Sequence, residues 1–368
     1  MKVLVVSGSS GGHIFPALSL LDALRLKDKN AQVILVLPRV NIPCDLSSVD
    51  YPVYKVSITN LRRGSFLASL ISILNFCKGF LESAFILLKF RPEAVVGFGS
   101  LVAIPVIFWA WILRIPILLH EQNVFPGRAN RLLAVIADRI AVSFLETYRY
   151  LKVPEKKIVL TGNPLRRELI RIEKPKALDF FGLKKDRFTI LIMGGSQGSR
   201  RLNSLFIQAL QGFREQEKDD IQVIHLCGQG DYELISPAYK ALSIEGRVFA
   251  FFESMQYAYS ASDLIVSRSG ASSIAEIMFY RIPAILIPYP YAYAHQVRNA
   301  AVLGEAGCAV IKEEKELTPE AFRSCLEGLL LNPGLLESMR FGYQGFKDMD
   351  ADIRLADAVL AIKRNRYL

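Results

Sequence analysis

The chain has 368 residues, a formal net charge of +10 and a mean hydropathy of +0.27. A single hydrophobic core rarely keeps growing at this length, so we expect two domains. The excess of Lys and Arg favours a polyanionic partner, and the lack of a zinc-finger spacing, a helix-turn-helix signature or an aromatic RNA-binding motif disfavours nucleic acid. The five cysteines form no CxxC pair, which indicates a reduced cytosol rather than a disulfide framework.

The first half of the chain alternates apolar runs of strand length with helical patterns, which predicts a parallel sheet covered on both faces. The expected strands are residues 3–6, 33–37, 53–56, 94–97, 117–119, 139–142 and 158–160.

Two apolar stretches in this half have the length of a membrane span. Residues 101–119 are interrupted by Pro105, Arg114 and Pro116, so we expect a buried helix followed by a strand. Residues 66–90 have an apolar helical pattern that polar residues break and Arg and Lys flank. This pattern is typical of a helix that lies on a membrane surface.

The second half repeats the order of strand, loop and helix, with strands expected at residues 189–193, 222–226, 248–251, 264–267, 284–287 and 309–312. Between the halves, Thr161-Gly162-Asn163-Pro164 predicts a turn, because Pro disfavours the helical conformation at the residue before it. We therefore predict an N-terminal domain of residues 1–163 and a C-terminal domain of residues 164–349. A last helix, about residues 350–368, is expected to pack back on the first domain.

A glycine-rich loop follows the first strand of each half and precedes a helix. The loops are residues 8–13 (GSSGGH) and 194–198 (GGSQG). Such a loop leaves backbone N–H groups unpaired at a helix N-terminus, where the helix dipole favours an anion. Neither loop has the GxGxxG spacing, which disfavours a dehydrogenase. A pair of tight strand-to-helix turns is the alternative to two nucleotide-type domains that face a shared cleft.

Polar side chains cluster near the expected ends of strands. His13 ends the first glycine loop, where a neutral imidazole can accept a proton from a hydroxyl; a structural histidine is the alternative. The sequence HEQN at 120–123 follows a strand, at the edge where parallel sheets bind ligands. His225 lies within an apolar strand and is expected in the core. No pair of histidines has metal-ligand spacing, so we expect no metal site.

In the second half, hydroxyl and amide side chains gather at expected helix starts. Residues 267–273 precede a helix that contains Glu276, whose carboxylate is placed to reach ribose hydroxyls. Gln296 and Asn299 open another helix after a loop rich in Tyr and Pro. Their amides suit sugar hydroxyls, which need both donors and acceptors.

Six of these segments, in order along the chain, resemble the MurG family of bacterial peptidoglycan N-acetylglucosaminyltransferases. They are residues 8–16 (GSSGGHIFP), 120–123 (HEQN), 162–166 (GNPLR), 194–198 (GGSQG), 268–276 (RSGASSIAE) and 295–299 (HQVRN). The resemblance implies an α/β fold of the GT-B type, in which two Rossmann-like domains with parallel sheets face a central cleft. It also implies an inverting hexosyltransferase that moves GlcNAc from UDP-GlcNAc to the C4 hydroxyl of MurNAc in undecaprenyl-diphospho-MurNAc-pentapeptide, for peptidoglycan biosynthesis.

The same resemblance assigns roles to single residues. It implies His13, as the base, and Glu121 as the catalytic residues. The donor-binding residues that it implies are Ser10, Gly11, Gly12, Asn123, Arg166, Ser196, Phe252, Ala271, Ser272, Ser273, Ile274, Ala275, Glu276 and Gln296. Charge develops on the sugar ring as in glycoside hydrolysis, and helix N-termini can stabilise the leaving diphosphate. We therefore expect no obligatory cofactor and no metal.

One segment departs from the family pattern. The family usually has GGY or GGF after the strand before HEQN, near the acceptor diphosphate, whereas here Gly99 is followed by Ser100 and Leu101.

The resemblance also implies peripheral attachment to the cytoplasmic face of the cell inner membrane. The apolar patch implied for this attachment contains Leu70, Leu74, Phe80 and Trp111, with basic residues around it. The partners implied are an anionic membrane surface and proteins of cell-wall synthesis, in a role linked to cell shape and cell division.

Two alternatives stay open at this point. One is another GT-B enzyme, either a lipid glycosyltransferase or a UDP-GlcNAc epimerase, and the latter would need no acceptor. The other is a noncatalytic membrane scaffold that binds a nucleotide sugar.

Overall fold

The computed structural model of the protein describes residues 1–40, 46, 49–58, 66–195, 198–290, 295–346 and 350–366. The contacts within the chain divide it into two compact units. Unit 1 is Met1–Arg166 together with Met349–Leu368, and unit 2 is Arg167–Asp348. The sequence placed the two divisions after residues 163 and 349, and the contacts place them after residues 166 and 348.

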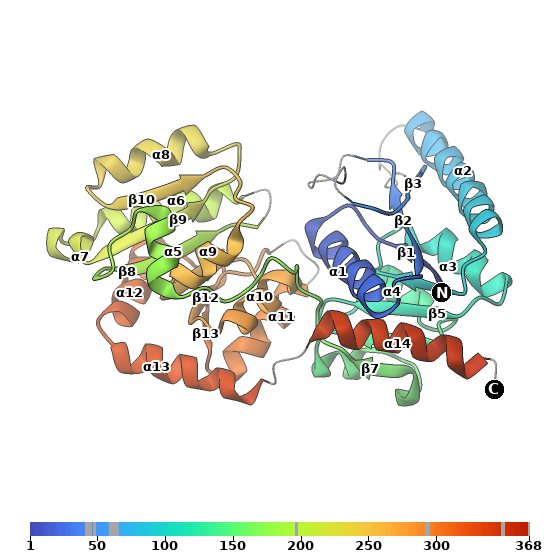
Figure 1. The fold of residues 1–368 in the computed structure, drawn as a ribbon. Coiled ribbons are helices and arrows are strands. Elements are labelled where there is room, and N and C mark those ends of the chain that lie inside the picture. Colours follow the sequence, from blue (N-terminus) through green and yellow to red (C-terminus); the bar gives the residue numbers. More distant parts are fainter. Residues whose placement is uncertain are drawn as a thin grey trace. The chain divides into compact units, whose positions relative to one another are not determined.

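Unit 1 is built on a parallel sheet of seven strands in the order β3-β2-β1-β4-β5-β6-β7 (Figure 1). The strands are β1 (Lys2–Val6), β2 (Gln32–Pro38), β3 (Val53–Val56), β4 (Ala94–Gly97), β5 (Ile117–Glu121), β6 (Arg139–Val142) and β7 (Ile158–Leu160). The helices are α1 (Gly11–Lys27), α2 (Phe66–Phe90), α3 (Ala103–Ile112), α4 (Arg128–Leu133) and α14 (Ala351–Arg366), with short 3-10 turns η1 (Leu145–Tyr150) and η2 (Glu155–Lys157). The predicted parallel sheet is confirmed.

Helices cover both faces of the unit 1 sheet. Side chains alternate along each strand, so each face carries apolar side chains that a layer of helices buries. Val3 and Val5 of β1 join a core with α1 and α14, whereas Leu4 and Val6 join a second core with α2, α3 and α4. The alternation explains why the first strand reads as one continuous apolar run. Helix α14 closes the first of these cores, and Asp357 on it pairs with Lys27 of α1 at 2.6 Å.

Unit 2 repeats the plan with a parallel sheet of six strands in the order β10-β9-β8-β11-β12-β13. The strands are β8 (Phe188–Met193), β9 (Ile221–Leu226), β10 (Glu245–Phe249), β11 (Leu264–Ser267), β12 (Ala284–Leu286) and β13 (Ala309–Ile311). The helices are α5 (Lys174–Phe181), α6 (Arg200–Gln211), α7 (Glu215–Asp219), α8 (Tyr232–Ala241), α9 (Met255–Ala261), α10 (Ala271–Tyr280), α11 (His295–Glu305), α12 (Pro319–Leu330) and α13 (Pro333–Gly342), followed by the turn η3 (Tyr343–Gly345). Helices α6, α8 and α12 pack on one face of this sheet.

Two predicted strands differ from the observed ones by more than one residue at an end. Strand β10 covers Glu245–Phe249 rather than residues 248–251, because it is an edge strand whose side chains are all half-buried and so lack an apolar run. Strand β5 continues through His120 and Glu121, which were expected in the loop after it. A helix and then a strand across residues 101–119 are confirmed by α3 and β5, but α3 is buried on one side only, because Phe108, Trp111 and Ile112 are exposed.

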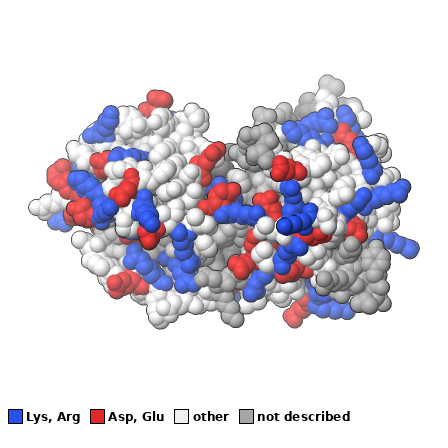
Figure 2. Space-filling view, viewed as in Figure 1, with Lys and Arg blue, Asp and Glu red and all other residues white. Residues whose placement is uncertain are grey.

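Helices α2 and α3 present an exposed apolar surface, which we call the apolar face. Its members are Ile71, Ile73, Leu74, Leu81, Phe85, Leu88, Phe108, Trp111 and Ile112. Figure 2 shows basic side chains along the edge of unit 1 where α2 lies. Within the described ranges, Ile71–Phe90 of α2 is long and apolar enough to cross a membrane by length and composition, and 28% of that stretch is buried.

The patch predicted from sequence overlaps the apolar face in part. Leu74 and Trp111 belong to it. Phe80 is half-buried instead, because its ring packs on those of Phe108 and Trp109, with centroids 5.4 and 5.3 Å away. The side chain of Leu70 lies outside the described residues.

Candidate active site

The strand order of each unit marks one place for a ligand. In unit 1 the order reverses between β1 and β4, and in unit 2 between β8 and β11. In open α/β sheets, ligands bind beyond the carboxyl ends of the strands at such a switch point. Both glycine loops that the sequence singled out follow the first strand of this pair, β1 or β8, so topology alone selects the same two places.

In unit 1 the loops after β1 and β4 are in direct contact. A Cβ atom added to Gly8 would lie 2.8 Å from the Cβ of Ser100 and 3.4 Å from the Cγ of His13, so only glycine fits there. Gly99 and Ser100 both have positive φ, at 79° and 69°. This conformation costs a residue such as Ser roughly 1–2 kcal/mol. Strain of this kind concentrates at functional sites and persists where surrounding contacts maintain it, and here Ser100 packs against the loop that carries His13.

His13 lies in the first turn of α1. Ser10 is the N-cap of that helix, but its hydroxyl pairs with Nδ1 of His13 at 2.7 Å and, within the part of the chain that the structure describes, with no backbone N–H. The N–H groups of Gly11 and Gly12 therefore lie at a helix N-terminus that has no side-chain cap. Desolvation lowers the pKa of the half-buried His13 to about 4, so the ring is neutral at physiological pH. With Nδ1 engaged by Ser10, Nε2 is the nitrogen that can meet a substrate.

His120 and Gln122 brace neighbouring loops from inside the fold. His120 is fully buried, its Nε2 lies 3.1 Å from the carbonyl oxygen of Gly162, and its Nδ1 lies 3.1 Å from Nε2 of Gln122. Burial lowers the pKa of His120 to about 4, so the ring is neutral. Its Nε2–H must then donate to the carbonyl while Nδ1 accepts from the amide. His120 therefore fixes the segment at Gly162, Gln122 fixes the ring of His120, and both side chains are buried.

Glu121 ends β5 with its carboxylate buried, since the residue is 1% exposed. Its Oε1 accepts from the backbone N and the Nδ2 of Asn123 at 2.9 and 3.2 Å. Its Oε2 accepts from the backbone N of Gly127 at 2.9 Å and from Nδ2 of Asn130 at 2.8 Å. Each carboxylate oxygen thus has two donors, and all four come from the loop and helix that follow β5.

Arg166, the last residue of the first segment of unit 1, reaches the first glycine loop. Its guanidinium carbon lies 4.7 Å from the ring centroid of Phe15 on α1. The same ring would be 3.1 Å from a Cβ at Gly11. Nearby in sequence, Asn163 is 5% exposed and both polar atoms of its amide have no hydrogen-bond partner among the described residues.

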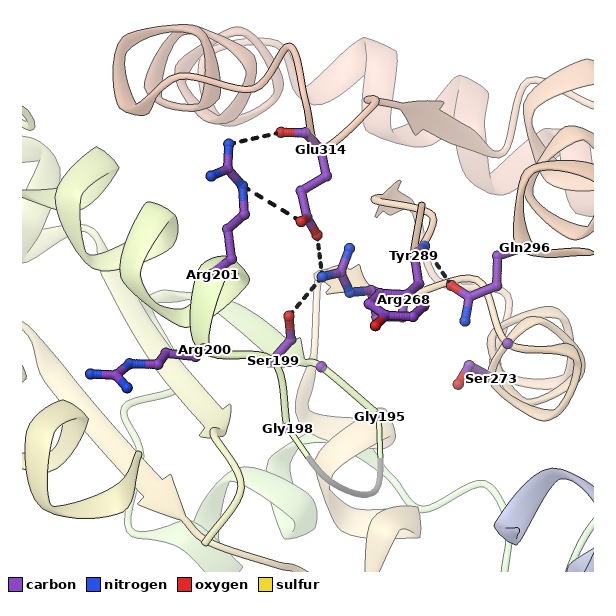
Figure 3. Close-up of a pocket in the computed structure, with 12 residues that line it drawn as sticks. Gly195, Gly198, Ser199, Arg200, Arg201, Arg268, Ser273, Tyr289, Gln296 and Glu314 are labelled. Atoms are coloured by element: carbon purple, nitrogen blue, oxygen red, sulfur yellow. Dashed lines mark hydrogen bonds and ion pairs between the residues drawn. The ribbon is translucent and has the colours of Figure 1, made fainter. Parts of the chain in front are cut away.

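In unit 2 a cavity of about 560 Å³ lies at the switch point (Figure 3). It is lined by Gly194, Gly195, Gly198, Ser199, Arg200, Arg201, Arg268, Gly270, Ser273, Tyr289, Gln296 and Glu314. The lining carries three arginines and one glutamate, so positive charge is in excess by two. Two of these arginines begin α6, where the helix dipole disfavours cations. A carboxylate of the chain lies near each of them, because Asp231 is 4.0 Å from Nε of Arg200 and Glu314 is 3.5 Å from Nε of Arg201.

Arg268 joins three loops of the cavity wall. Its Nη1 donates to the carbonyl oxygens of Ile287 and Pro288 at 3.1 and 3.4 Å. Its Nη2 donates to Oγ of Ser199 at 2.7 Å and forms an ion pair with Glu314. Arg201 approaches the same glutamate from the other side, with its Nε 3.5 Å from Oε1 (Figure 3). The side chain of Glu314, which is 11% exposed, therefore lies between two guanidinium groups.

Gln296 and Ser273, two residues expected in the donor site, line this cavity. The Oε1 of Gln296 accepts from the backbone N–H groups of Ser269 and Tyr289 at 3.2 and 2.9 Å, which fixes the amide and aims its Nε2 at the cavity side of α11. Ser273 lies in the first turn of α10, whose N-cap is Gly270.

The other expected residues of α10 have different surroundings. Ala271 and Ile274 are buried, Ala275 is half-buried, and Oγ of Ser272 is buried without a partner among the described residues. Glu276 accepts a hydrogen bond from the hydroxyl of Tyr259 at 2.5 Å.

Phe252 follows β10 within a cluster of aromatic rings. Its ring centroid lies 4.7, 5.4 and 6.2 Å from those of Phe249, Phe181 and Phe180. Phe180 in turn stacks on Tyr257, with centroids 4.1 Å apart. Ser196 of the second glycine loop lies outside the described residues. Of the described residues, no group of three or more His, Cys, Asp or Glu side chains is placed to hold a metal.

Five residues that line the cavity were not expected from the sequence, namely Arg200, Arg201, Ser199, Tyr289 and Glu314. A signal existed for the first two, because adjacent arginines after a glycine loop oppose the dipole of the helix that they begin. Glu314 follows β13 and carries no local signal, since its partner Arg268 follows a different strand.

Two family models match the two parts of the chain. Residues 3–142 match the glycosyltransferase family 28 N-terminal domain, and residues 189–359 match the glycosyltransferase family 28 C-terminal domain. Together with the two parallel sheets and their switch points, these matches define a glycosyltransferase of the GT-B fold.

Comparison with individual relatives identifies the family within this class of glycosyltransferases. A UDP-N-acetylglucosamine--N-acetylmuramyl-(pentapeptide) pyrophosphoryl-undecaprenol N-acetylglucosamine transferase from Desulforamulus reducens is 34% identical over 347 residues, which is 92% of either chain. The protein of the same name from Thermoanaerobacter sp. is 34% identical over 98% of this chain and 100% of its own length. The crystal structure of Acinetobacter baumannii MurG superposes with a TM-score of 0.76 at 26% identity, over 98% of this chain and 99% of that one. The chain belongs to the MurG family.

Proposed function

We propose that this protein transfers N-acetylglucosamine from UDP-GlcNAc to the C4 hydroxyl of the N-acetylmuramic acid in an undecaprenyl-diphosphate-linked pentapeptide precursor, with inversion at the anomeric carbon. The names of its relatives supply the two substrates. The observation in this chain that carries the proposal is the cavity of unit 2, whose lining combines a glycine loop, a helix N-terminus and an excess of two positive charges.

The cavity suits the diphosphate of a nucleotide sugar. A diphosphate diester carries two negative charges, which matches the excess of positive charge in the lining. When the sugar leaves, the UDP that remains gains charge, and preorganised donors stabilise such a leaving group. The backbone N–H groups at the start of α6 and the guanidinium of Arg201 supply these donors. We therefore propose that the reaction needs no metal, with the chain's own cations taking that role.

The acceptor hydroxyl needs a base, and His13 has the right protonation state for one. Because its pKa is about 4, the ring is neutral and can accept a proton at physiological pH. If Nδ1–H donates to Ser10, then Nε2 presents its lone pair to the acceptor. The hydroxyl oxygen bonds to the anomeric carbon as its proton moves to Nε2, and the bond from that carbon to the phosphate oxygen breaks with its electron pair leaving on UDP.

The apolar face supports peripheral binding to the cytoplasmic side of the inner membrane. Large side chains such as Phe85 and Leu81 are 64% and 68% exposed on α2, while exposed basic residues such as Lys78 and Lys89 lie on the same helix. Apolar insertion and attraction to anionic lipids add together in this arrangement. A lipid-linked acceptor is confined to that surface, so docking would bring the enzyme to its substrate.

The decisive experiment incubates the purified chain with UDP-GlcNAc and a short-chain lipid-linked MurNAc-pentapeptide, with and without EDTA, followed by mass analysis. We expect the acceptor to gain the mass of one N-acetylhexosamine in both samples. An arm with donor alone tests the epimerase alternative, because an epimerase rearranges its donor with no acceptor present. Binding of UDP without any product would favour the scaffold, and loss of product with EDTA would refute metal independence.

A further inference from the structure

The surroundings of Glu121 do not resemble those of a group that exchanges protons with a substrate. A carboxylate has about four lone-pair directions, and each of the two oxygens of Glu121 already accepts two hydrogen bonds. The side chain is buried at the end of a strand, and the backbone oxygen of the same residue accepts from Ser143 through both its N–H and its hydroxyl, each at 3.0 Å. Glu121 is therefore held from both ends.

The two carboxylate oxygens hold two different arms. Among the described residues, Oε1 binds only Asn123, which fixes the backbone and the amide of an expected donor-binding residue. Oε2 binds Gly127 and Asn130, which fixes the start of α4. One charge thus organises the whole turn between β5 and α4.

The second arm continues to the loop beside His13. Nδ2 of Asn130 donates to both Glu121 and the backbone oxygen of His120, and two acceptors on one atom set the orientation of that amide. A Cβ at Gly99 would be 3.3 Å from the same Nδ2, so the Asn130 side chain packs directly under the strained loop. That loop carries Ser100, which packs against the glycine loop of His13.

We propose that Glu121 is a positioning residue that sets the donor-side Asn123 through one oxygen and the acceptor-side loop of Gly99 and Ser100 through the other. This inference rests on the proposed function, and it replaces the direct catalytic role that the sequence suggested for Glu121. The buried carboxylate of Glu121 fixes the positions of the loops at which both substrates bind, so its removal weakens the binding of both substrates.

The test measures the KM for each substrate separately in three variants of the full chain. Glu121→Gln keeps the size of the side chain but turns an N–H group toward donors, so we expect the KM for UDP-GlcNAc and the KM for the lipid acceptor to rise at least about tenfold each. Asn130→Ala cuts only the second arm, so we expect the acceptor KM to rise while the UDP-GlcNAc KM stays within about twofold. Glu155→Gln is the matched control, since this exposed carboxylate of unit 1 lies outside the site.

The pH profile separates positioning from proton transfer. A positioning residue changes the height of the profile of kcat/KM and not its shape, whereas loss of a general acid or base removes one limb. Loss of a limb in Glu121→Gln, or equal rises of both KM values in Asn130→Ala, would overturn the inference. Circular dichroism and thermal unfolding check that the variants fold, and Asn130→Ala keeps the test valid if Glu121→Gln does not. An inactive wild-type enzyme would instead count against the proposed function.

Discussion

Replacing Arg268 with Ala should lower the free energy of unfolding of unit 2 and weaken UDP binding together. Arg268 is 5% exposed, and its guanidinium joins Ser199, two backbone carbonyls and Glu314. Removing one partner of a buried ion pair costs about 3–5 kcal/mol, because the other charge stays buried. Arg201 remains 3.5 Å from Glu314, so we expect the lower end of this range, about 3 kcal/mol.

Urea unfolding followed by circular dichroism measures the stability, and calorimetric titration with UDP measures the affinity. The double variant Arg268→Ala/Glu314→Gln should lose less than the sum of the two single losses, because no charged carboxylate is left behind. Lys176→Ala is the control in the same unit, since the Lys176–Glu173 pair is more than two-thirds exposed and should contribute less than about 1 kcal/mol. A loss below about 1 kcal/mol in Arg268→Ala with unchanged UDP affinity, or losses that simply add in the double variant, would refute this account of the cavity wall.

Four further outcomes follow from the same structure. His13→Ala should abolish turnover and leave UDP binding within about twofold, and because the pKa of His13 is about 4, kcat/KM of the wild type should show no acidic limb between about pH 5 and 7; a limb near pH 6.5 would contradict this. Burial lowers the pKa of His225 to about 3, so between this pH and about 6.5 the unfolded chain binds a proton at His225 that the folded chain does not bind. Urea titrations should therefore show the free energy of unfolding falling as pH drops below about 6.5, and falling less steeply in His225→Gln. Ser100→Val should lower the melting temperature more than Ser100→Gly, because a β-branched residue tolerates positive φ least, and equal melting temperatures would count against strain at this loop. Leu81→Glu combined with Phe85→Glu should reduce co-sedimentation with anionic vesicles while leaving the melting temperature unchanged, and undiminished sedimentation would exclude the apolar face as the docking surface.

The fold could be predicted from sequence because its central strands are buried on both faces. Val3 to Val6 form a continuous apolar run for this reason, and the helical patterns between such runs require parallel pairing. The prediction failed where this logic weakens, at the half-buried edge strand β10 and at His120 and Glu121, which are polar residues within a buried strand.

The site was predictable only where local chemistry leaves a local pattern. The glycine loops and His13 have such a pattern, because close approach of chain segments requires Gly8 and a helix start follows. Ser100 does not, since nothing in its type announces positive φ. From sequence, a glutamate at the end of a strand, such as Glu121, suggests a group that reacts with substrate. Only the structure shows that its carboxylate accepts hydrogen bonds from groups such as Asn130.

The chain passes between its two units twice, and the second crossing returns α14 to unit 1. Leu355, Ala356 and Val359 of α14 are fully buried there, beside the pair between Lys27 and Asp357. A protease that cleaves the chain where it first passes from unit 1 to unit 2 would therefore not release two separate fragments. The carboxyl-terminal fragment would still contain α14, which packs in the core of unit 1. The sixteen residues of α14 therefore link the two units by noncovalent packing. Without this packing, cleavage of a single peptide bond between the units would separate them.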